Sequence, residues 1–163
     1  MRPKRIEPGP GQESVWDYPR PPRTEATRDV VEVSFGDLMI AQTTTAIRVL
    51  ETSQPPVYYI PREDIDFASL IADPDRTYCE WKGEASYYSL SVPVETIPQV
   101  AWSYPQPKEG FESIAHYVAF YAQKLNCTVN GEVVAANEGT FYGGWITSKV
   151  VGPFKGGLGT AWW

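Results

Sequence analysis

Eleven residues near the middle of the chain, "YCEWKGEASYY" at positions 78–88, bring several reactive side-chain types together. They include the thiol of Cys79, the indole of Trp81, the ammonium group of Lys82 and the phenol of Tyr87. Three interpretations are open at the outset. The stretch is a reactive site, one rim of a ligand-binding pocket, or a hairpin whose aromatic residues pack for stability.

Cys79 is the candidate nucleophile of this stretch. A reactive cysteine needs a lowered pKa, which a histidine, a nearby cation or a helix N-terminus can provide. Lys82 and Arg62 are the candidate cations, whereas the single histidine, His116, lies far along the sequence. Lone cysteines in strands are more often small buried hydrophobic residues. The sequence therefore favours a structural Cys79 over a catalytic one.

Lys82 is followed directly by Gly83, which indicates a sharp turn or a close approach of another backbone. A lysine held in such a turn could act with Arg62 to bind a carboxylate or phosphate group. The alternative is a salt bridge between Lys82 and one of the neighbouring glutamates, and the sequence leaves both interpretations open.

Aromatic residues on two predicted neighbouring strands suggest a pocket wall. Residues two apart in a strand share a face, so Trp81 pairs with Cys79 and Trp102 with Tyr104. Together with Tyr87, they would form an aromatic wall with a cation at its rim, which is a common form of small-molecule site. The alternative is a β core stabilised by aromatic cross-strand pairs.

The metal-binding potential of the chain is low. Asp64 and Asp66 form a D-x-D pair in "EDID" and are weak candidates for a Mg²⁺ or Ca²⁺ site. Structural zinc needs four cysteine or histidine ligands at paired spacings, and one histidine with two cysteines cannot supply them. We expect no cofactor.

Most of the elements that must position these groups are predicted strands. β-branched and aromatic residues with period-two alternation or short apolar runs predict strands at 30–35, 38–43, 45–52, 57–60 and 96–104. "RTYCEW" and "SYYSLSV" are predicted to form a hairpin around "KGEA". Residues 62–75 are predicted to connect the strands, ending in a turn at Asp73-Pro74-Asp75.

One helix is expected near the C-terminus, from Gly110 to Leu125. Phe111, Ile114, Val118, Tyr121 and Leu125 are spaced by three and four residues, as on one stripe of a helix. After this segment, Asn130-Gly131 lies between β-branched residues and predicts a tight hairpin.

These patterns predict a mostly β (α+β) fold of one domain in 163 residues. We expect a compact antiparallel sandwich, barrel-like or tent-like sheet with one main α-helix near the C-terminus. The predicted domain covers residues 13–125, after a flexible N-terminus at 1–12 and before an extension at 126–163. That extension combines the hairpin with a tail rich in glycine and aromatic residues, which is expected to wrap the domain or a partner.

Charge and hydropathy limit the partners of the chain. The net charge is −6 and the pI is about 4.8, which argue against binding to nucleic acid or an anionic membrane. No apolar run approaches the length of about 20 residues that a membrane span needs. The start lacks the apolar stretch of a secretory signal, so we expect a cytoplasmic protein whose Cys79 and Cys127 are reduced.

Several motifs together resemble one protein family. They are "ESVWDYPRPP" (13–22), "LETSQPPVYYIPREDI" (50–65), "YCEWKGEASYYSL" (78–90), "AWSYPQP" (101–107) and "IAHYVAFY" (114–121). In this order they are similar to the family called domain of unknown function 427, which also carries a nucleotidyltransferase-like label. The hairpin and tail beyond residue 125 resemble what cyanobacterial members append.

The resemblance implies a small, mostly β protein without an assigned reaction. Its marker segments point to Arg62, Glu63, Asp64, Cys79, Trp81, Lys82, Gly83 and Tyr87. The nucleotidyltransferase label implies two metal ions held by D-x-D after a Gly-Ser turn, with a third carboxylate on a later strand. Here no Gly-Ser precedes Asp64, and no third carboxylate is evident.

Three functions follow, in order of preference. The first is small-ligand binding through an aromatic, partly cationic pocket formed by Arg62, Glu63, Cys79, Trp81, Lys82, Tyr87, Trp102 and Tyr104. The second is a protein interaction or homo-oligomer through the Pro-rich arm "WDYPRPPR", whose PxxP spacing suits an aromatic groove, or through the C-terminal tail. The third is a divergent metal-dependent enzyme that handles nucleotides through Asp64 and Asp66.

Overall fold

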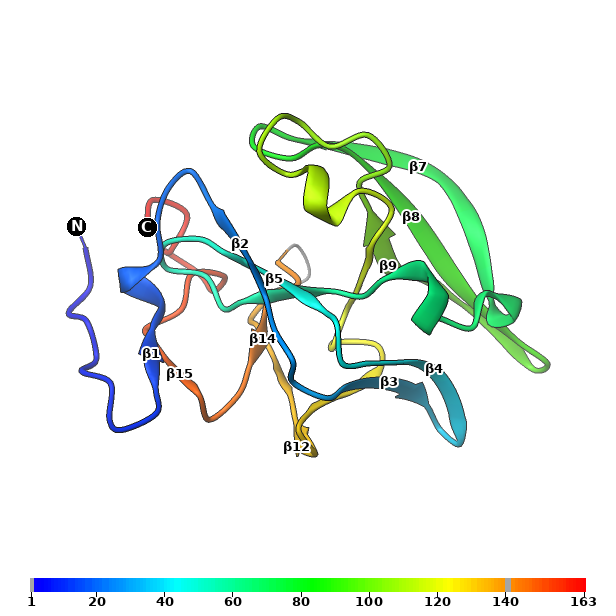
Figure 1. The fold of residues 1–163 in the computed structure, drawn as a ribbon, viewed down its shortest axis with the longest axis horizontal. Coiled ribbons are helices and arrows are strands. Elements are labelled where there is room, and N and C mark those ends of the chain that lie inside the picture. The colour runs from blue at the N-terminus through cyan, green and yellow to red at the C-terminus, as the bar shows by residue number, and fades with distance from the viewer. Residues whose placement is uncertain (1, 140–141) are drawn as a thin grey trace.

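The chain runs mainly in β-strands that belong to several small open sheets (Figure 1). The computed structural model describes residues 2–139 and 142–163. Its strands are β1 (Glu13–Ser14), β2 (Arg23–Ala26), β3 (Val31–Phe35), β4 (Leu38–Thr43), β5 (Ile47–Leu50), β6 (Val57–Tyr59), β7 (Leu70–Cys79), β8 (Gly83–Val92), β9 (Glu95–Ser103), β10 (Val118–Phe120), β11 (Asn126–Val129), β12 (Glu132–Val133), β13 (Ala135–Ala136), β14 (Trp145–Ile146) and β15 (Val150–Val151). The short 3-10 helices are η1 (Val15–Asp17), η2 (Arg62–Asp64), η3 (Phe67–Ser69) and η4 (Glu112–Ile114).

The three longest strands, together with the short β10, form a four-stranded antiparallel sheet in the order β10-β9-β8-β7. A second sheet has the order β12-β11-β3-β4, and a third has the order β2-β5-β6. A single bridge between Ile60 and Val118 links the chain after β6 to β10. The expectation of a mostly β, antiparallel fold is therefore confirmed, and within the described residues none of the sheets closes into a barrel.

The main core lies where the first two sheets meet. Val31 and Val33 of β3 are fully buried while the intervening Glu32 is partly exposed, as the alternation of a half-buried strand requires. They pack in one cluster with Leu90, Val118 and other apolar residues of the β10-β9-β8-β7 sheet. The predicted Asn-Gly hairpin is present between β11 and β12, with φ of 50° at Asn130 and 81° at Gly131.

The predicted helix from Gly110 to Leu125 is wrong. The segment forms η4, then strand β10, then a turn that leads to β11, and the described residues contain no long helix. His116 has φ of 64°, which an α-helix cannot accommodate. All three residues of β10 are buried, so both faces of the strand are apolar and period-two alternation is hidden. The residues of the predicted helical stripe do not share one face, because Ile114 packs in one hydrophobic cluster and Val118 in another.

The predicted turn at Asp73-Pro74-Asp75 is also wrong. Strand β7 continues through it, and the pairing with β8 shifts register between Asp73 and Arg76. Proline has no N–H to donate to a ladder, and a bulge is one place in a sheet where this loss is tolerated. The Asp-Pro-Asp sequence, which usually indicates a turn, here marks a bulge. This bulge contributes residues to the candidate site.

The N-terminal arm and the C-terminal tail pack against each other, and Figure 1 places the two chain ends on the same side of the molecule. Strand β1 pairs in parallel with β15. The indole Nε1 of Trp16 donates a hydrogen bond to the carbonyl of Pro153 at 2.8 Å, and its ring lies 5.8 Å from that of Trp163. The tail therefore covers the domain, although its Thr140 and Phe141, like Met1, lie outside the described residues.

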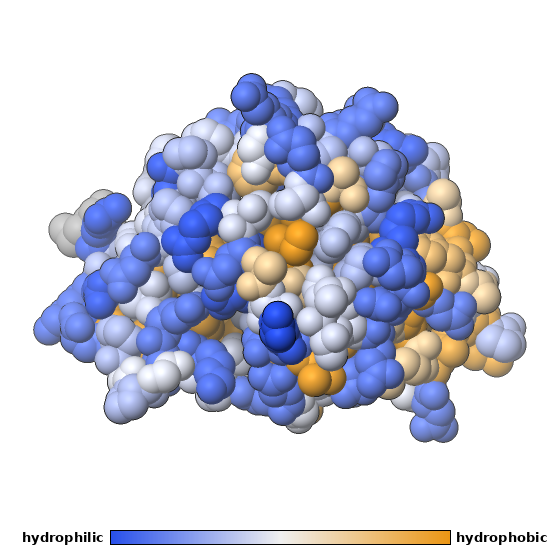
Figure 2. Space-filling model, viewed as in Figure 1, coloured by the Kyte–Doolittle hydropathy of each residue, from blue (hydrophilic) through white to orange (hydrophobic). Residues whose placement is uncertain are grey.

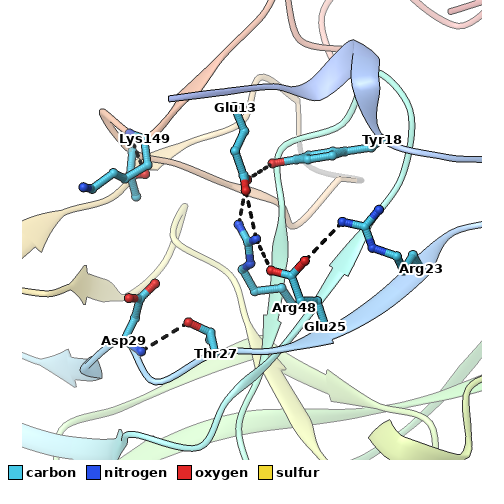
Figure 3. A network of polar contacts seen from close by, with 9 residues as sticks. Glu13, Tyr18, Arg23, Glu25, Thr27, Asp29, Arg48 and Lys149 are labelled. Carbon is cyan, nitrogen blue, oxygen red and sulfur yellow. Dashed lines mark hydrogen bonds and ion pairs between the residues drawn. The ribbon is translucent and has the colours of Figure 1, made fainter. Parts of the chain in front are cut away.

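An ion-pair network fixes the arm to the β2-β5-β6 sheet (Figure 3). Arg48 of β5 donates hydrogen bonds to Glu13 of β1 and to Glu25 of β2, and the hydroxyl of Tyr18 donates to Glu13 at 2.7 Å. Burial by itself raises the pKa of Glu13, but the hydrogen bonds from Arg48 and Tyr18 outweigh it and hold this pKa below its usual value. The hydrogen bond from Arg48 likewise lowers the pKa of Glu25.

The free energy of unfolding is expected to fall in acid because of these two carboxylates. A group whose pKa is lower in the folded protein stabilises it above the unfolded value of 4.5, and this stabilisation is lost as the pH falls through the folded pKa. Urea unfolding of the Glu13→Gln variant between pH 7 and pH 3 should therefore show a shallower loss of stability than the parent protein. Glu95→Gln, at an exposed position outside these ion pairs, is the control and should keep the parent slope.

None of the helices in the described part of the chain is both long and apolar enough to cross a membrane.

Candidate functional site

The register of the β10-β9-β8-β7 sheet brings aromatic side chains together on one face. Tyr87 of β8 is paired with Trp102 of β9, and Trp102 with Ala119 of β10. Paired residues point to the same face, as do residues two apart, so Tyr104 and Ala85 share this face. This face carries a hydrophobic cluster separate from the main core, with Tyr59, Trp102, Tyr104, Phe111 and Ile114 among its buried members.

A cavity of about 360 Å³ opens beside this cluster. It is lined by Asp75, Arg76, Thr77, Tyr87, Gln99, Trp102, Tyr104, Tyr121, Tyr142 and Gly143. Half of these residues are aromatic, and the volume lies within the range of small-molecule sites. The lining therefore combines a ring-lined wall with a small number of polar groups.

The indole of Trp102 is held by two neighbouring rings. Its centroid lies 4.5 Å from that of Tyr121, and the ring of Tyr59 meets it edge-on at 6.3 Å. The indole Nε1 donates a long hydrogen bond of 3.4 Å to the hydroxyl of Tyr59. Aromatic contacts of this kind hold a side chain in one orientation, so the Trp102 ring is set before any ligand arrives.

The tyrosine hydroxyls of the cavity differ in their partners. The hydroxyls of Tyr87 and Thr77 are hydrogen-bonded at 2.7 Å, and Tyr121 is hydrogen-bonded to Tyr87. The hydroxyl of Tyr104 has no hydrogen-bond partner among the described residues, and it stays accessible although the residue as a whole is only 6% exposed. Burial raises the pKa of Tyr104 and of Tyr121 well above the usual value, so both phenols stay protonated at neutral pH.

The bulge in β7 forms the polar mouth of the cavity. It faces Gln99 of β9, whose side-chain Nε2 donates to Asp75 Oδ2 at 2.7 Å. Arg76 folds back, and one of its terminal nitrogens donates to the backbone carbonyls of Asp73 and Asp75 at 2.8 and 2.7 Å. The backbone of Gln99 has φ of 49°, and its N–H donates to the hydroxyl of Ser89 at 3.0 Å.

The C-terminal segment supplies the remaining wall. Gln123 holds it through its side-chain Nε2, which lies within 3.1–3.3 Å of the carbonyls of Asn137, Gly139 and Tyr142. Gly143 lies so close to the Trp102 ring that an added Cβ atom would be 2.1 Å from it. Only glycine fits this contact, so the segment can lie flat against the indole.

Only some of the predicted site residues line the cavity. Tyr87, Trp102 and Tyr104 do so. Cys79 and Trp81 pack against the same hydrophobic cluster but are not part of the lining. The ammonium nitrogen of Lys82 lies 5.8 Å from the centroid of the Tyr104 ring, also outside the lining.

Arg62 and Glu63 lie apart from the aromatic cavity. Arg62 donates a hydrogen bond of 3.1 Å to the hydroxyl of Tyr88 and stacks over the Phe67 ring at 4.2 Å. Tyr88 follows Tyr87 in β8, so it points to the opposite face of the sheet. Glu63 is exposed in η2. The cation that lines the cavity is Arg76.

Asp64 and Asp66 hold local structure. Asp64 accepts a hydrogen bond from the Thr43 hydroxyl at 2.7 Å, and Asp66 caps η3 by accepting from the backbone N–H of Ala68. Over residues 2–139 and 142–163, no three histidine, cysteine, aspartate or glutamate side chains are grouped to hold a metal ion. Cys79 and Cys127 are both free thiols, and burial raises the pKa of Cys127 to about 12.

Several lining residues escaped the sequence analysis. Asp75, Arg76 and Thr77 follow a proline inside a strand pattern, which is the signal of a bulge and could have placed them. Gln99 follows Pro98 in β9 in the same way. The spacing of Tyr121 instead places it on the stripe of the predicted helix, and the approach of Gly143 to Trp102 has no local sequence signal.

The fold and the cavity define a class: a small, mostly β protein with an aromatic cavity on one face of an antiparallel sheet. A family model described as Domain of unknown function (DUF427), with the label NTP_transf_9, matches residues 23–135. This match spans more than half of the chain, and the chain belongs to that family. No curated protein matches the chain.

Proposed function

We propose that the protein binds a small molecule that contains a flat ring with a polar substituent, in the aromatic cavity beside β8 and β9. The observation that carries this proposal is the Tyr104 hydroxyl, which belongs to a residue only 6% exposed, lines the cavity and has no hydrogen-bond partner among the described residues. This hydroxyl is therefore available to form a hydrogen bond with a ligand atom in the cavity.

Binding without a chemical step is the activity that the lining groups support best. The phenols of Tyr104 and Tyr121 stay protonated at neutral pH, so they can donate hydrogen bonds but are poor general bases. Cys79, the candidate nucleophile, is not part of the lining. Trp102 and Tyr121 offer the ring of a ligand two aromatic surfaces of fixed orientation.

The Tyr104→Phe variant tests the proposal with p-cresol and toluene as probes, followed by NMR or tryptophan fluorescence. p-Cresol should bind the parent protein, and the variant should bind it about 5- to 10-fold more weakly because one hydrogen bond is lost. The affinity for toluene should not fall. Tyr78→Phe is the matched control, since Tyr78 is 68% exposed and does not line the cavity. Failure of p-cresol and toluene to bind the parent protein would refute the proposal.

A protein interaction is the second candidate. The Pro-rich arm is engaged with the tail, but the right-hand edge of the molecule in Figure 2 carries an apolar patch. In Figure 1 this edge holds the β3–β4 turn, the start of β7 and the β8–β9 turn. Exposed apolar side chains of these parts of the chain are Met39 of β4, Ile71 of β7 and Val94 between β8 and β9. Contiguous apolar patches mark contact surfaces in many proteins. None of these three residues lines the cavity.

A further inference from the structure

Two opposite charges stand next to each other at the mouth of the cavity. Asp75 and Arg76 are consecutive residues of the β7 bulge, and both are exposed and line the cavity. The bulge places both at the cavity, whereas in a regular strand successive side chains point to opposite faces. The irregular part of β7 therefore coincides with the position of this charged pair.

Both charges are positioned but not neutralised by the chain. Gln99 donates to Asp75 Oδ2, and the other carboxylate oxygen, Oδ1, has no hydrogen-bond partner among the described residues. Arg76 uses one terminal nitrogen for two backbone carbonyls, which leaves its Nε and second terminal nitrogen for an incoming acceptor. Within the described ranges, neither side chain forms an ion pair.

The two ends of the cavity differ in the groups that they offer to a ligand. Gln99, Trp102 and Tyr104 follow one another along β9 and just past its end, with Asp75 hydrogen-bonded to Gln99 at one end. Tyr104, whose hydroxyl has no partner among the described residues, lies at the other end, with its Cα about 7 Å along the strand from that of Trp102 at the rise of a β-strand. A ligand that fits this order has a charged end at the mouth, a ring over Trp102 and a polar atom at Tyr104.

We propose that the cavity selects the zwitterion of an amino acid with a hydroxylated aromatic side chain. Its ammonium group would meet the carboxylate of Asp75, its carboxylate would meet the free guanidinium nitrogens of Arg76, and its ring would stack on Trp102. This inference rests on the proposed function, because it assumes that the cavity binds rings. Arginine recognises carboxylates with two parallel hydrogen bonds, which makes Arg76 specific for that end.

Calorimetric titration with four probes tests the pair. The probes are L-tyrosine, tyramine, which lacks the carboxylate, the deaminated analogue of tyrosine, which lacks the ammonium group, and p-cresol, which lacks both. L-Tyrosine should bind about 10-fold more tightly than either singly charged analogue, since each charge-assisted hydrogen bond is worth about this factor. Each of two variants should remove one part of this preference. Arg76→Gln should remove the advantage of L-tyrosine over tyramine, and Asp75→Asn its advantage over the deaminated analogue.

Asp37→Asn, in the β3–β4 turn away from the lining residues, is the matched control and should retain both preferences. If p-cresol binds as tightly as L-tyrosine, the charged pair has no role and this inference fails while the proposed ring binding stands. Preference for a single-charge analogue over L-tyrosine would also overturn it. If none of the four probes binds, both the inference and the proposed function fail.

Discussion

Truncating Trp145 to alanine is expected to lower the free energy of unfolding by about 3–5 kcal/mol. Trp145 is 1% exposed, and its ring stacks on that of Tyr58 at a centroid distance of 5.2 Å. Its indole Nε1 donates a hydrogen bond of 2.9 Å to the carbonyl of Phe120. The variant would leave both a large void in the main core and a buried carbonyl without its donor.

Urea unfolding monitored by far-UV circular dichroism measures this effect. Trp162→Ala is the matched control, because Trp162 is 91% exposed and its removal should change the free energy of unfolding by less than about 0.5 kcal/mol. The comparison also bears on the family boundary, since Trp145 lies beyond the matched residues 23–135. A loss below about 1 kcal/mol would mean that the C-terminal segment only covers a core that is already complete.

The strands could be predicted from the sequence where one face is buried and the other meets solvent. Val31 and Val33 alternate with polar residues, and β4 was predicted at its observed bounds, Leu38–Thr43. Strand β10 cannot be predicted in this way, because a strand buried on both faces has no apolar–polar alternation. The apolar spacing around Val118 then resembles a helix, and only the pairing with β9 distinguishes the two.

The part of the site that consists of cross-strand residue pairs within one hairpin can be predicted from the sequence. Tyr87 and Trp102 could be placed together because they come from strands predicted to be neighbours, and the structure pairs them directly. Arg76 could not, because a register shift changes which face a side chain reaches. Gly143 is more than 40 residues from Trp102 in sequence, and a contact of this kind is specified by the packing of the whole molecule.

The contact between the C-terminal segment and the sheet makes the shape of the cavity depend on residues outside the family match. Tyr142 and Gly143 are the two lining residues beyond residue 135, and all the others lie within the matched range. Gln123, inside the match, holds the backbone of this segment. The aromatic wall therefore belongs to the family domain, while its closure on one side belongs to this chain's own extension.

Replacing Gly143 with alanine is accordingly expected to damage the cavity more than the fold. The new Cβ atom would lie 2.1 Å from the Trp102 ring, closer than any real contact, so either the indole or the segment must move. Overpacking of this kind costs about 1–3 kcal/mol of stability. Because Trp102 is the ring on which a ligand would stack, the affinity for p-cresol should fall about 2- to 10-fold, as expected for the loss of one aromatic contact.

Titration with p-cresol, alongside urea unfolding of the same samples, separates the two effects. Gly9→Ala is the matched control, because its Cβ would meet only the flexible end of Gln12 at 3.3 Å, and it should change neither quantity appreciably. Near-UV circular dichroism would register the displaced indole of Trp102 directly. If Gly143→Ala binds p-cresol with parent affinity and keeps the parent near-UV spectrum, the extension does not close the cavity, and ring binding must depend on the sheet alone.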